Sequence, residues 1–160
     1  MQAHPFDPII FPDSKILILG SFPSLKSFEK NFYYAHPRNQ FWPLLAAVFN
    51  EENSTIEAKI SLCQKHHLAL WDSAKMLSRE SGNSSDSNLK DIVPNDFKKL
   101  LEDFPSIEKV YFTGKKAEAI FNQHFKDIAI EKALLPSPSP AFAAMSFEKK
   151  LIRYKELFNP

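Results

Sequence analysis

The sequence predicts an α/β fold in which a parallel sheet is covered by helices on both of its faces. Two observations support this prediction. Four short apolar runs are continuous rather than alternating, which is typical of strands buried on both faces. Helix-like segments alternate with these runs, as the crossovers of a parallel sheet require. The runs span residues 15–19, 67–71, 109–112 and 128–135.

The helix-like segments carry apolar residues at helical spacing. Asn95 precedes the third segment and Ser146 opens the last, and both residue types favour helix N-caps. The polar residues 78–87 show little pattern and are predicted to form a loop. We expect one domain over residues 1–160. The helix-like segments span residues 41–49, 56–66, 96–104, 115–125 and 146–158.

Composition restricts the class of protein. The single cysteine, Cys63, excludes an intrachain disulfide and any metal centre built from several thiolates. No signal peptide and no apolar stretch of membrane-spanning length are visible, which predicts a cytoplasmic protein without a membrane partner. The net charge of +1 argues against a surface coated in positive charge, but it is compatible with a local basic face.

Two glycines mark one edge of the predicted sheet. Gly20 follows the first apolar run and Gly114 follows the third. In open parallel sheets, ligands bind beyond the carboxyl ends of the strands, and a glycine there allows a sharp turn or a close approach of the backbone. Either glycine alone is equally well explained by a strand-to-helix turn. Together with the loops 20–39 and 136–140, they predict a site at this edge.

The segment YYAHPRNQFW, residues 33–42, combines flat rings with one amide. Tyr33 and Tyr34 offer faces on which a planar ligand could stack, an interaction worth roughly 1–3 kcal/mol per base. Asn39 lies near the start of the helix predicted at 41–49, so it is either a simple N-cap or a functional amide. Phe41 and Trp42 are expected in the core.

The segment LPSPSPA, residues 135–141, is stiff because its prolines fix φ and remove backbone donors. It presents Ser137 and Ser139, whose small hydroxyls suit phosphate oxygens. Read alone, such a run is more often a surface connector. The motifs of phosphate-binding loops, zinc proteases and serine hydrolases are absent, and no metal site is expected.

Taken together and in this order, ILILGSFPS, YYAHPRNQFWPLL, LALWD, SDSNLKDIVPNDF and LPSPSPA resemble the uracil-DNA glycosylase superfamily. They resemble specifically its hypoxanthine-DNA glycosylase branch, family 6, whose members are also called DNA-deoxyinosine glycosylases. The resemblance implies a three-layer α/β/α sandwich with a central four-stranded parallel sheet. It also implies a monofunctional enzyme that flips a deaminated base out of DNA, hydrolyses the N-glycosidic bond and leaves an abasic site.

The resemblance implies that Asn39 is the catalytic amide, that residues 20–24 form the first active-site motif and that residues 136–140 grip the DNA backbone. An amide cannot act as a general base at neutral pH, but it can orient water and hydrogen-bond the departing base, and no metal or organic cofactor is needed. The expected base-binding residues are Gly20, Ser21, Phe22, Pro23, Tyr33, Tyr34 and Thr113. The expected DNA-binding residues are Ser24, Arg38, Pro136, Ser137, Pro138, Ser139, Pro140 and Phe142.

Three residues depart from the pattern of the superfamily. Phe22 stands where many members have Asn or Asp, so this position cannot activate water. Leu135 stands where the best-known uracil enzymes have His, so no imidazole stabilises a leaving base there. Thr113 stands where members commonly have a base-reading Asn, which removes one bidentate amide contact. Hypoxanthine remains the expected base, and uracil and xanthine stay open.

Two other classes of protein were weighed. A DNA- or nucleotide-binding module of the same fold with weak or no catalysis is compatible with Thr113 and with the near-neutral charge. A hydrolase with Ser21 or Ser137 as nucleophile lacks a visible basic partner for either serine. For the glycosylase, we expect a monomer that acts on DNA containing a deaminated base, at the nucleoid of a prokaryote-like cell.

Overall fold

A computed structural model describes residues 2–4, 7–79 and 89–158. Its centre is a four-stranded sheet in the order β3-β2-β6-β7, with every neighbouring pair parallel. In register, Gly20 at the end of β2 lies beside Asp72 at the end of β3. The predicted parallel sheet is therefore confirmed. Its strands are β2 (Ile16–Gly20), β3 (Leu68–Asp72), β6 (Lys109–Phe112) and β7 (Glu131–Leu134).

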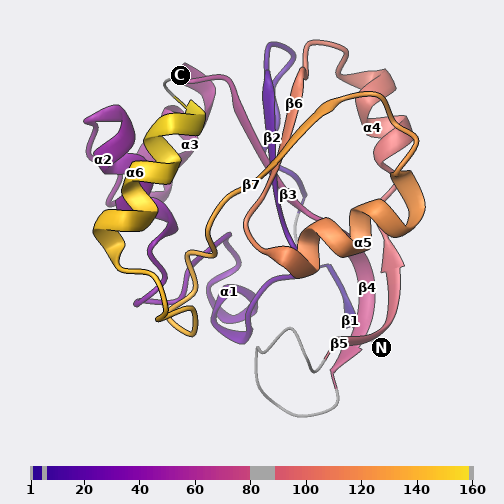
Figure 1. The fold of residues 1–160 in the computed structure, drawn as a ribbon, viewed down its shortest axis with the longest axis horizontal. Helices are drawn as coiled ribbons and strands as arrows, with labels where there is room; N and C mark the ends of the chain where they lie inside the picture. The colour runs from indigo at the N-terminus through magenta and orange to yellow at the C-terminus, as the bar shows by residue number, and fades with distance from the viewer. Residues whose placement is uncertain (1, 5–6, 80–88, 159–160) are drawn as a thin grey trace.

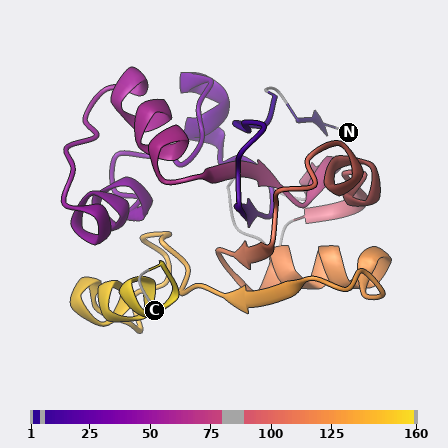
Figure 2. The same cartoon turned by 90° about the horizontal axis from the view of Figure 1, so that it is seen from above.

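Helices cover both faces of this sheet, which confirms the predicted three layers (Figures 1 and 2). Alternate residues of β2 explain why, because Ile18 packs in one apolar cluster whereas Leu17 and Leu19 pack in the other. The first face carries α2 (Phe41–Phe49), α3 (Ile56–Lys65) and α6 (Phe147–Phe158). The second face carries α4 (Phe97–Asp103) and α5 (Lys115–Phe125).

The structure adds a small antiparallel sheet and a short helix that the sequence did not predict. The sheet has the order β1-β4-β5 and lies beyond the carboxyl end of β3 (Figure 1). Of the loop predicted at 78–87, residues 78 and 79 belong to β4, and residues 80–87 lie outside the described part of the chain. The added elements are β1 (Gln2–Ala3), β4 (Ala74–Arg79), β5 (Leu89–Pro94) and α1 (Leu25–Lys30).

Of the two N-caps that the sequence predicted, Ser146 is confirmed and Asn95 is wrong. Ser146 accepts a hydrogen bond from Lys149 N at 3.3 Å, as predicted. Asn95 does not cap α4: Asp96 does, accepting from Lys99 N at 3.1 Å. Asn95 is instead buried, and its Nδ2 donates to the Asp72 carbonyl at 2.8 Å. It therefore ties the end of β3 to the second sheet.

Two further findings concern the single cysteine and membranes. Cys63 is fully buried, and burial raises its pKa to about 12, so it is an inert core thiol. Within residues 2–4, 7–79 and 89–158, no helix is long and apolar enough to cross a bilayer.

Candidate active site

A cavity of about 850 Å³ opens at the carboxyl edge of the central sheet, where the sequence predicted a site. It brings together loops that are far apart in the chain. Every predicted site residue lines it except Arg38, which is exposed outside the lining. The predicted residues in the lining are Asn39, Gly20, Ser21, Phe22, Pro23, Ser24, Tyr33, Tyr34, Thr113, Pro136, Ser137, Pro138, Ser139, Pro140 and Phe142.

Gly20 is required by the crowding at the inner end of the cavity. A Cβ atom at this position would lie 2.6 Å from Asp72 Oδ1 and 3.1 Å from the Tyr34 hydroxyl. Thr113 Oγ1 would lie 3.5 Å away. Only a residue without a side chain allows three polar groups from different segments to meet here. Gly20 is therefore explained by this close approach, and not by a strand-to-helix turn alone.

Tyr34 is held by both its ring and its hydroxyl. The ring stacks on Phe41 with the centroids 4.0 Å apart, so the core covers one of its faces. The hydroxyl lies 3.0 Å from Thr113 Oγ1, which itself donates to the Leu19 carbonyl at 3.3 Å. Since the Thr113 proton is used in that bond, Tyr34 is the donor to Thr113. Burial, followed by the charge of Asp72, raises the pKa of Tyr34 and keeps its hydroxyl protonated.

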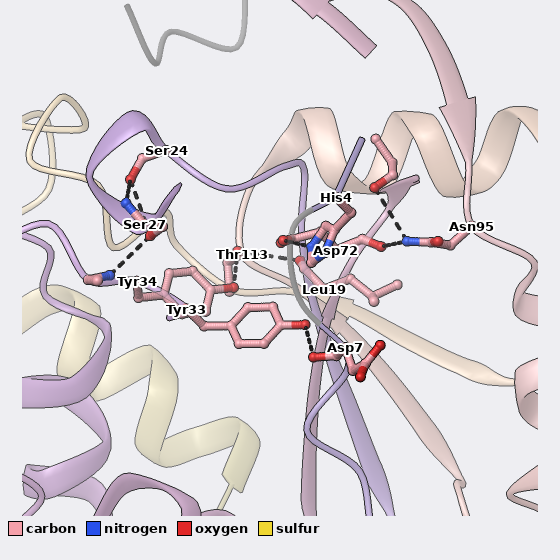
Figure 3. Close-up of polar contacts among 12 residues, drawn as sticks. His4, Asp7, Leu19, Ser24, Ser27, Tyr33, Tyr34, Asp72, Asn95 and Thr113 are labelled. Atoms are coloured by element: carbon pink, nitrogen blue, oxygen red, sulfur yellow. Dashed lines mark hydrogen bonds and ion pairs between the residues drawn. The ribbon is translucent and has the colours of Figure 1, made fainter. Parts of the chain in front are cut away.

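Tyr33 is a core residue whose surface reaches the cavity. It is 3% exposed, and its hydroxyl donates to the Asp7 carbonyl at 2.9 Å (Figure 3). Its own carbonyl accepts from Trp42 Nε1 at 3.0 Å. The ring packs against Phe32 and His4, so it is less available for stacking than the sequence suggested. Trp42 is buried, as predicted.

Asn39 is fixed at the start of α2 by its side-chain oxygen. Oδ1 accepts from Phe41 N at 2.9 Å, and Asn39 N donates to the His36 carbonyl at 2.9 Å. The next residue, Gln40, donates its backbone N–H to the Pro138 carbonyl at 2.9 Å. The amide therefore stabilises the helix start and also lines the cavity, so capping and a catalytic role are compatible.

The proline loop, residues 136–140, uses its serines in local hydrogen bonds. Ser137 Oγ accepts from Ser139 N, and Ser139 Oγ accepts from Ala141 N, both at 3.2 Å. Each hydroxyl still has a hydrogen that can be donated to an anion. Tyr154 anchors the loop by donating to the Pro136 carbonyl at 3.0 Å. Such rigid hydroxyls can bind phosphate oxygens.

Lys150 is a structural residue, although a lysine on a helix is usually a solvated surface charge. It is 2% exposed, and its Nζ donates to Gln40 Oε1 at 2.8 Å. The same ammonium lies 5.4 Å from the ring centroid of Phe142. Burial lowers the pKa of Lys150. Lys150 thus connects α6 to the Asn39 segment and to Phe142, which is 38% exposed beside the cavity.

Sequence reasoning missed two residues at the inner end. Asp72 is 4% exposed and lines the cavity, and its Oδ2 lies 2.7 Å from His4 Nε2 (Figure 3). Asp72 could have been found, because it follows a predicted strand at the same sheet edge as Gly20. His4 could not have been found in this way, since its link to Asp72 spans 68 positions.

The described residues contain no cluster of side chains that could bind a metal ion. No group of three or more His, Cys, Asp or Glu side chains there is arranged to hold an ion. The polar side chains that line the cavity carry hydroxyls, one amide, one carboxylate, the His36 imidazole and the ammonium groups of Lys115 and Lys116 at the start of α5. This set suits hydrogen bonding to a planar polar ligand and to phosphates.

The chain is similar to several known proteins. A family model described as the uracil DNA glycosylase superfamily matches residues 8–160. The chain is 37% identical over 119 residues to a hypoxanthine DNA glycosylase of Methanosarcina barkeri, covering 73% of this chain and 74% of the relative. It is 35% identical over 143 residues to a protein of that name from Methanosarcina acetivorans, covering 88% and 89%. A solution structure of a candidate uracil DNA glycosylase from Methanosarcina acetivorans has a TM-score of 0.83 and 32% identity, covering 96% of this chain and 94% of that one.

Proposed function

Because the chain belongs to the uracil DNA glycosylase superfamily, we propose that it is a monofunctional DNA glycosylase that removes hypoxanthine from DNA. The observation that carries the proposal is the placement of Asn39, Gly20, Tyr34 and the proline loop around one cavity at the sheet edge. The names of the two curated relatives supply the choice of hypoxanthine. We further propose that it acts as a monomeric single domain.

The proposed reaction begins with a flipped nucleotide whose base enters the cavity. Flipping costs a few kcal/mol and costs least for a mispaired base, which favours deaminated sites. The proline loop and the exposed Arg38 would hold the flanking phosphates. Phe142, exposed at the cavity, is suited to fill the gap left in the base stack.

The C1′–N9 bond then breaks through an oxocarbenium-like state, as in other glycosyl transfers. The bonding electron pair leaves with the base, water attacks C1′, and the proton that the water loses is balanced by protonation of the departed base. Asn39 is oriented by its bond to Phe41 N, so its amide N–H groups are available to the departing base or to the water. A loose transition state needs orientation and charge stabilisation more than a strong base, which an amide can provide.

A binding module without catalysis is the second candidate. Thr113 favours it, because the hydroxyl already donates to the Leu19 carbonyl and cannot replace a bidentate amide. This candidate predicts binding to DNA that contains inosine, without formation of an abasic site. The two proposals therefore differ in one measurable product.

The test is a gel assay with labelled duplexes that contain one hypoxanthine, uracil or xanthine. A glycosylase yields strand cleavage only after alkali treatment, since it leaves an intact abasic site. Asn39→Ala should lower the single-turnover rate by about 10²-fold or more, the loss typical of one preorganised donor. Gln64→Ala, which removes an exposed amide of α3, is the matched control and should change nothing.

Two results would contradict the proposal. If the folded wild-type protein binds the hypoxanthine duplex but cleaves none of the three, the proposal is wrong and the binding module is favoured. If Asn39→Ala releases hypoxanthine at the wild-type rate, the catalytic role of Asn39 is wrong. Circular dichroism of both variants distinguishes a chemical effect from loss of the fold.

A further inference from the structure

The ammonium group of Lys150 is a buried charge for which the described residues supply no anionic partner. Lys150 lies on α6 and is 2% exposed. Its Nζ donates to the side-chain carbonyl of Gln40, which is neutral, at 2.8 Å. None of the ion pairs between described residues includes Lys150. A buried charge is costly unless an opposite charge compensates it, so Lys150 lacks the kind of partner that its burial requires.

Two lysines that do have carboxylate partners show the opposite arrangement. Lys65 pairs with Glu51, and its side chain is 66% exposed. Lys99 pairs with Asp103, and its side chain is 71% exposed. Water already solvates such charges, so these pairs contribute little to stability. Lys150 is shielded from water, and burial lowers its pKa with no charged neighbour to oppose the effect. The fold alone does not explain a lysine here, because an apolar side chain of similar length would pack without this cost.

Phe142 covers this ammonium on the side of the cavity. Lys150 Nζ lies over the Phe142 ring, 5.4 Å from its centroid. The ring is 38% exposed and lines the cavity, whereas Lys150 is not part of the lining. A cation–π contact compensates a charge only in part, because the ring carries no net charge. A rotation about the side-chain bonds of Phe142 would therefore open a path from the cavity to the ammonium.

The segments around the ammonium are those that we expect to hold DNA. The backbone N–H of Gln40 donates to the Pro138 carbonyl at 2.9 Å, so the side chain of Gln40 bonds Lys150 directly beside the proline loop. One turn along α6, Tyr154 donates to the Pro136 carbonyl of the same loop at 3.0 Å. Helix α6 thus holds Lys150 next to the loop whose serine hydroxyls suit phosphate oxygens. A backbone phosphate is the anion that DNA would bring to this loop.

We propose that Lys150 binds a backbone phosphate of DNA, and that this phosphate takes the place that the Phe142 ring holds in the free protein. When the ring enters the base stack it leaves the ammonium, and the phosphate supplies a partner with a full negative charge. The inference rests on the proposed function for the identity of the anion, since that function brings DNA to the cavity. It assigns a phosphate site to a residue that is buried in the free protein, in addition to its structural contacts.

The exchange of partners links insertion of Phe142 to the contact with one phosphate. If the ring left and no anion arrived, the ammonium would lose its only contact on that side, which opposes insertion. If a phosphate arrived while the ring stayed, the ring would block it. Each event therefore favours the other, as linkage requires. A purely structural Lys150 would support Phe142 equally, whatever the charge of any single phosphate. The charge of one phosphate is thus the variable that separates the two roles.

The experiment removes the charge of one phosphate at a time. Each duplex carries one 2′-fluoro nucleoside of hypoxanthine, which cannot be cleaved, and one neutral methylphosphonate in place of a phosphate near it. Binding is followed by fluorescence anisotropy. At one position, wild type should lose about tenfold in affinity, the usual worth of one hydrogen bond to a charged group. Lys150→Met should lose no more than about twofold further at that position, because the partner of the phosphate is already absent. At all other positions the two proteins should respond equally.

A second measurement follows insertion of the ring. The base analogue 2-aminopurine, placed beside the lesion, becomes more fluorescent when its base stack is opened by a wedge. At saturating protein, the methylphosphonate at the sensitive position should lower this signal in wild type and leave it unchanged in Lys150→Met. Phe142→Ala lacks the ring, so it should give the same low signal with and without the methylphosphonate.

Control variants separate the charge of Lys150 from its structural support. Lys149→Met removes an exposed charge from the same helix and should respond to every methylphosphonate as wild type does. Gln40→Ala keeps the ammonium but removes its hydrogen-bond acceptor, so it should keep the tenfold response. Lys150→Met should be at least as stable as wild type in urea, because an apolar side chain replaces a buried charge without an anionic partner. Lys150→Gln is the second uncharged variant, to be used if methionine prevents folding.

The inference is overturned if Lys150→Met loses as much affinity as wild type at every methylphosphonate position, because Lys150 then acts through the fold alone. It is equally overturned if Gln40→Ala loses the response together with Lys150→Met, since support of Gln40 would then be the cause. Failure of the glycosylase proposal is recognised separately. In that case wild type cleaves no natural inosine duplex, while the sensitive phosphate and its loss in Lys150→Met still support Lys150 as its partner.

Discussion

The inner end of the cavity is closely bonded, whereas the outer end includes the most exposed residues of the site. We define the inner end as Gly20, Tyr34, Asp72 and Thr113, and the outer end as the proline loop and Phe142 together with Arg38, which lies outside the cavity lining beside Asn39. At the inner end, the Tyr34 hydroxyl lies 3.0 Å from Thr113 Oγ1, and Asp72 Oδ1 approaches the same side of the Gly20 backbone. At the outer end, Arg38, Pro140 and Phe142 are exposed.

This difference matches two kinds of recognition. A base is distinguished by one or two hydrogen bonds whose direction must be fixed, so the groups that read it need rigid support. A phosphate backbone is the same at every nucleotide, so contacts to it can be exposed and individually weak. Changes at the inner end should thus alter which base is removed, and changes at the outer end should alter the affinity for all DNA.

The largest effect is expected from Gly20→Ala, which tests how tightly the inner end is packed. The new methyl group would lie 2.6 Å from Asp72 Oδ1, so the strand or the carboxylate must shift. A misplacement of about 1 Å at a reacting centre costs about a hundredfold in rate. We expect a loss of that size in single-turnover hypoxanthine excision, with a destabilisation of about 1–3 kcal/mol in urea unfolding.

A double mutant identifies the cause of the destabilisation. If the clash with Asp72 is responsible, Gly20→Ala should cost clearly less stability in an Asp72→Ala background than in wild type. Equal costs in the two backgrounds would show that the crowding arises elsewhere. The Tyr34 hydroxyl, 3.1 Å from the same Cβ position, would then be the neighbour that resists the methyl group.

The sequence predicted the sheet and most of the cavity for a physical reason. Strands buried on both faces leave continuous apolar runs, and the rule for parallel sheets then places Gly20 and Thr113 at one edge. The antiparallel sheet was missed because β1 has two residues and β4 mixes Lys75 and Ser78 with its apolar residues. These strands are stabilised by pairing with each other, so their amino-acid sequences show little local pattern that would predict a strand.

Contacts across long stretches of sequence explain the remaining differences. Lys150 looked like a surface charge because its partner Gln40 lies 110 positions away. His4 carried no signal for the same reason. Asp72 was different, since its position at a strand end was predictable and only its role was overlooked. A strand end at the edge of a parallel sheet should therefore be examined for every polar residue, not for glycines alone.

An intermediate effect is expected from Lys150→Met, which tests how the outer end is supported. Methionine keeps most of the volume but loses the bond to Gln40 Oε1 and the contact with the Phe142 ring. We expect the affinity for every duplex to fall by about tenfold, the worth of one hydrogen bond to a charged group. The preference for hypoxanthine over adenine should be unchanged. Anisotropy titrations measure both quantities.

The neighbouring Lys149→Met variant is the control for this prediction. Lys149 is exposed on the same helix, so the variant removes the same charge without touching Gln40. A loss of affinity as large in Lys149→Met as in Lys150→Met would mean that charge alone matters. A changed base preference in Lys150→Met would show that the two ends are coupled, contrary to the division proposed here.

The smallest effect is expected from Arg38→Gln, which tests whether the outer end contacts phosphates. Arg38 is exposed beside Asn39, and one phosphate contact contributes about 0.9 to the slope of log affinity against log salt. Arg38→Gln should reduce that slope by this amount, so the variant should lose about threefold less affinity than wild type between 50 and 200 mM salt. Lys98→Gln, on α4 at the opposite face, should leave the slope unchanged. If the slope of Arg38→Gln equals that of wild type, Arg38 makes no phosphate contact, and the outer end consists of the proline loop and Phe142 alone.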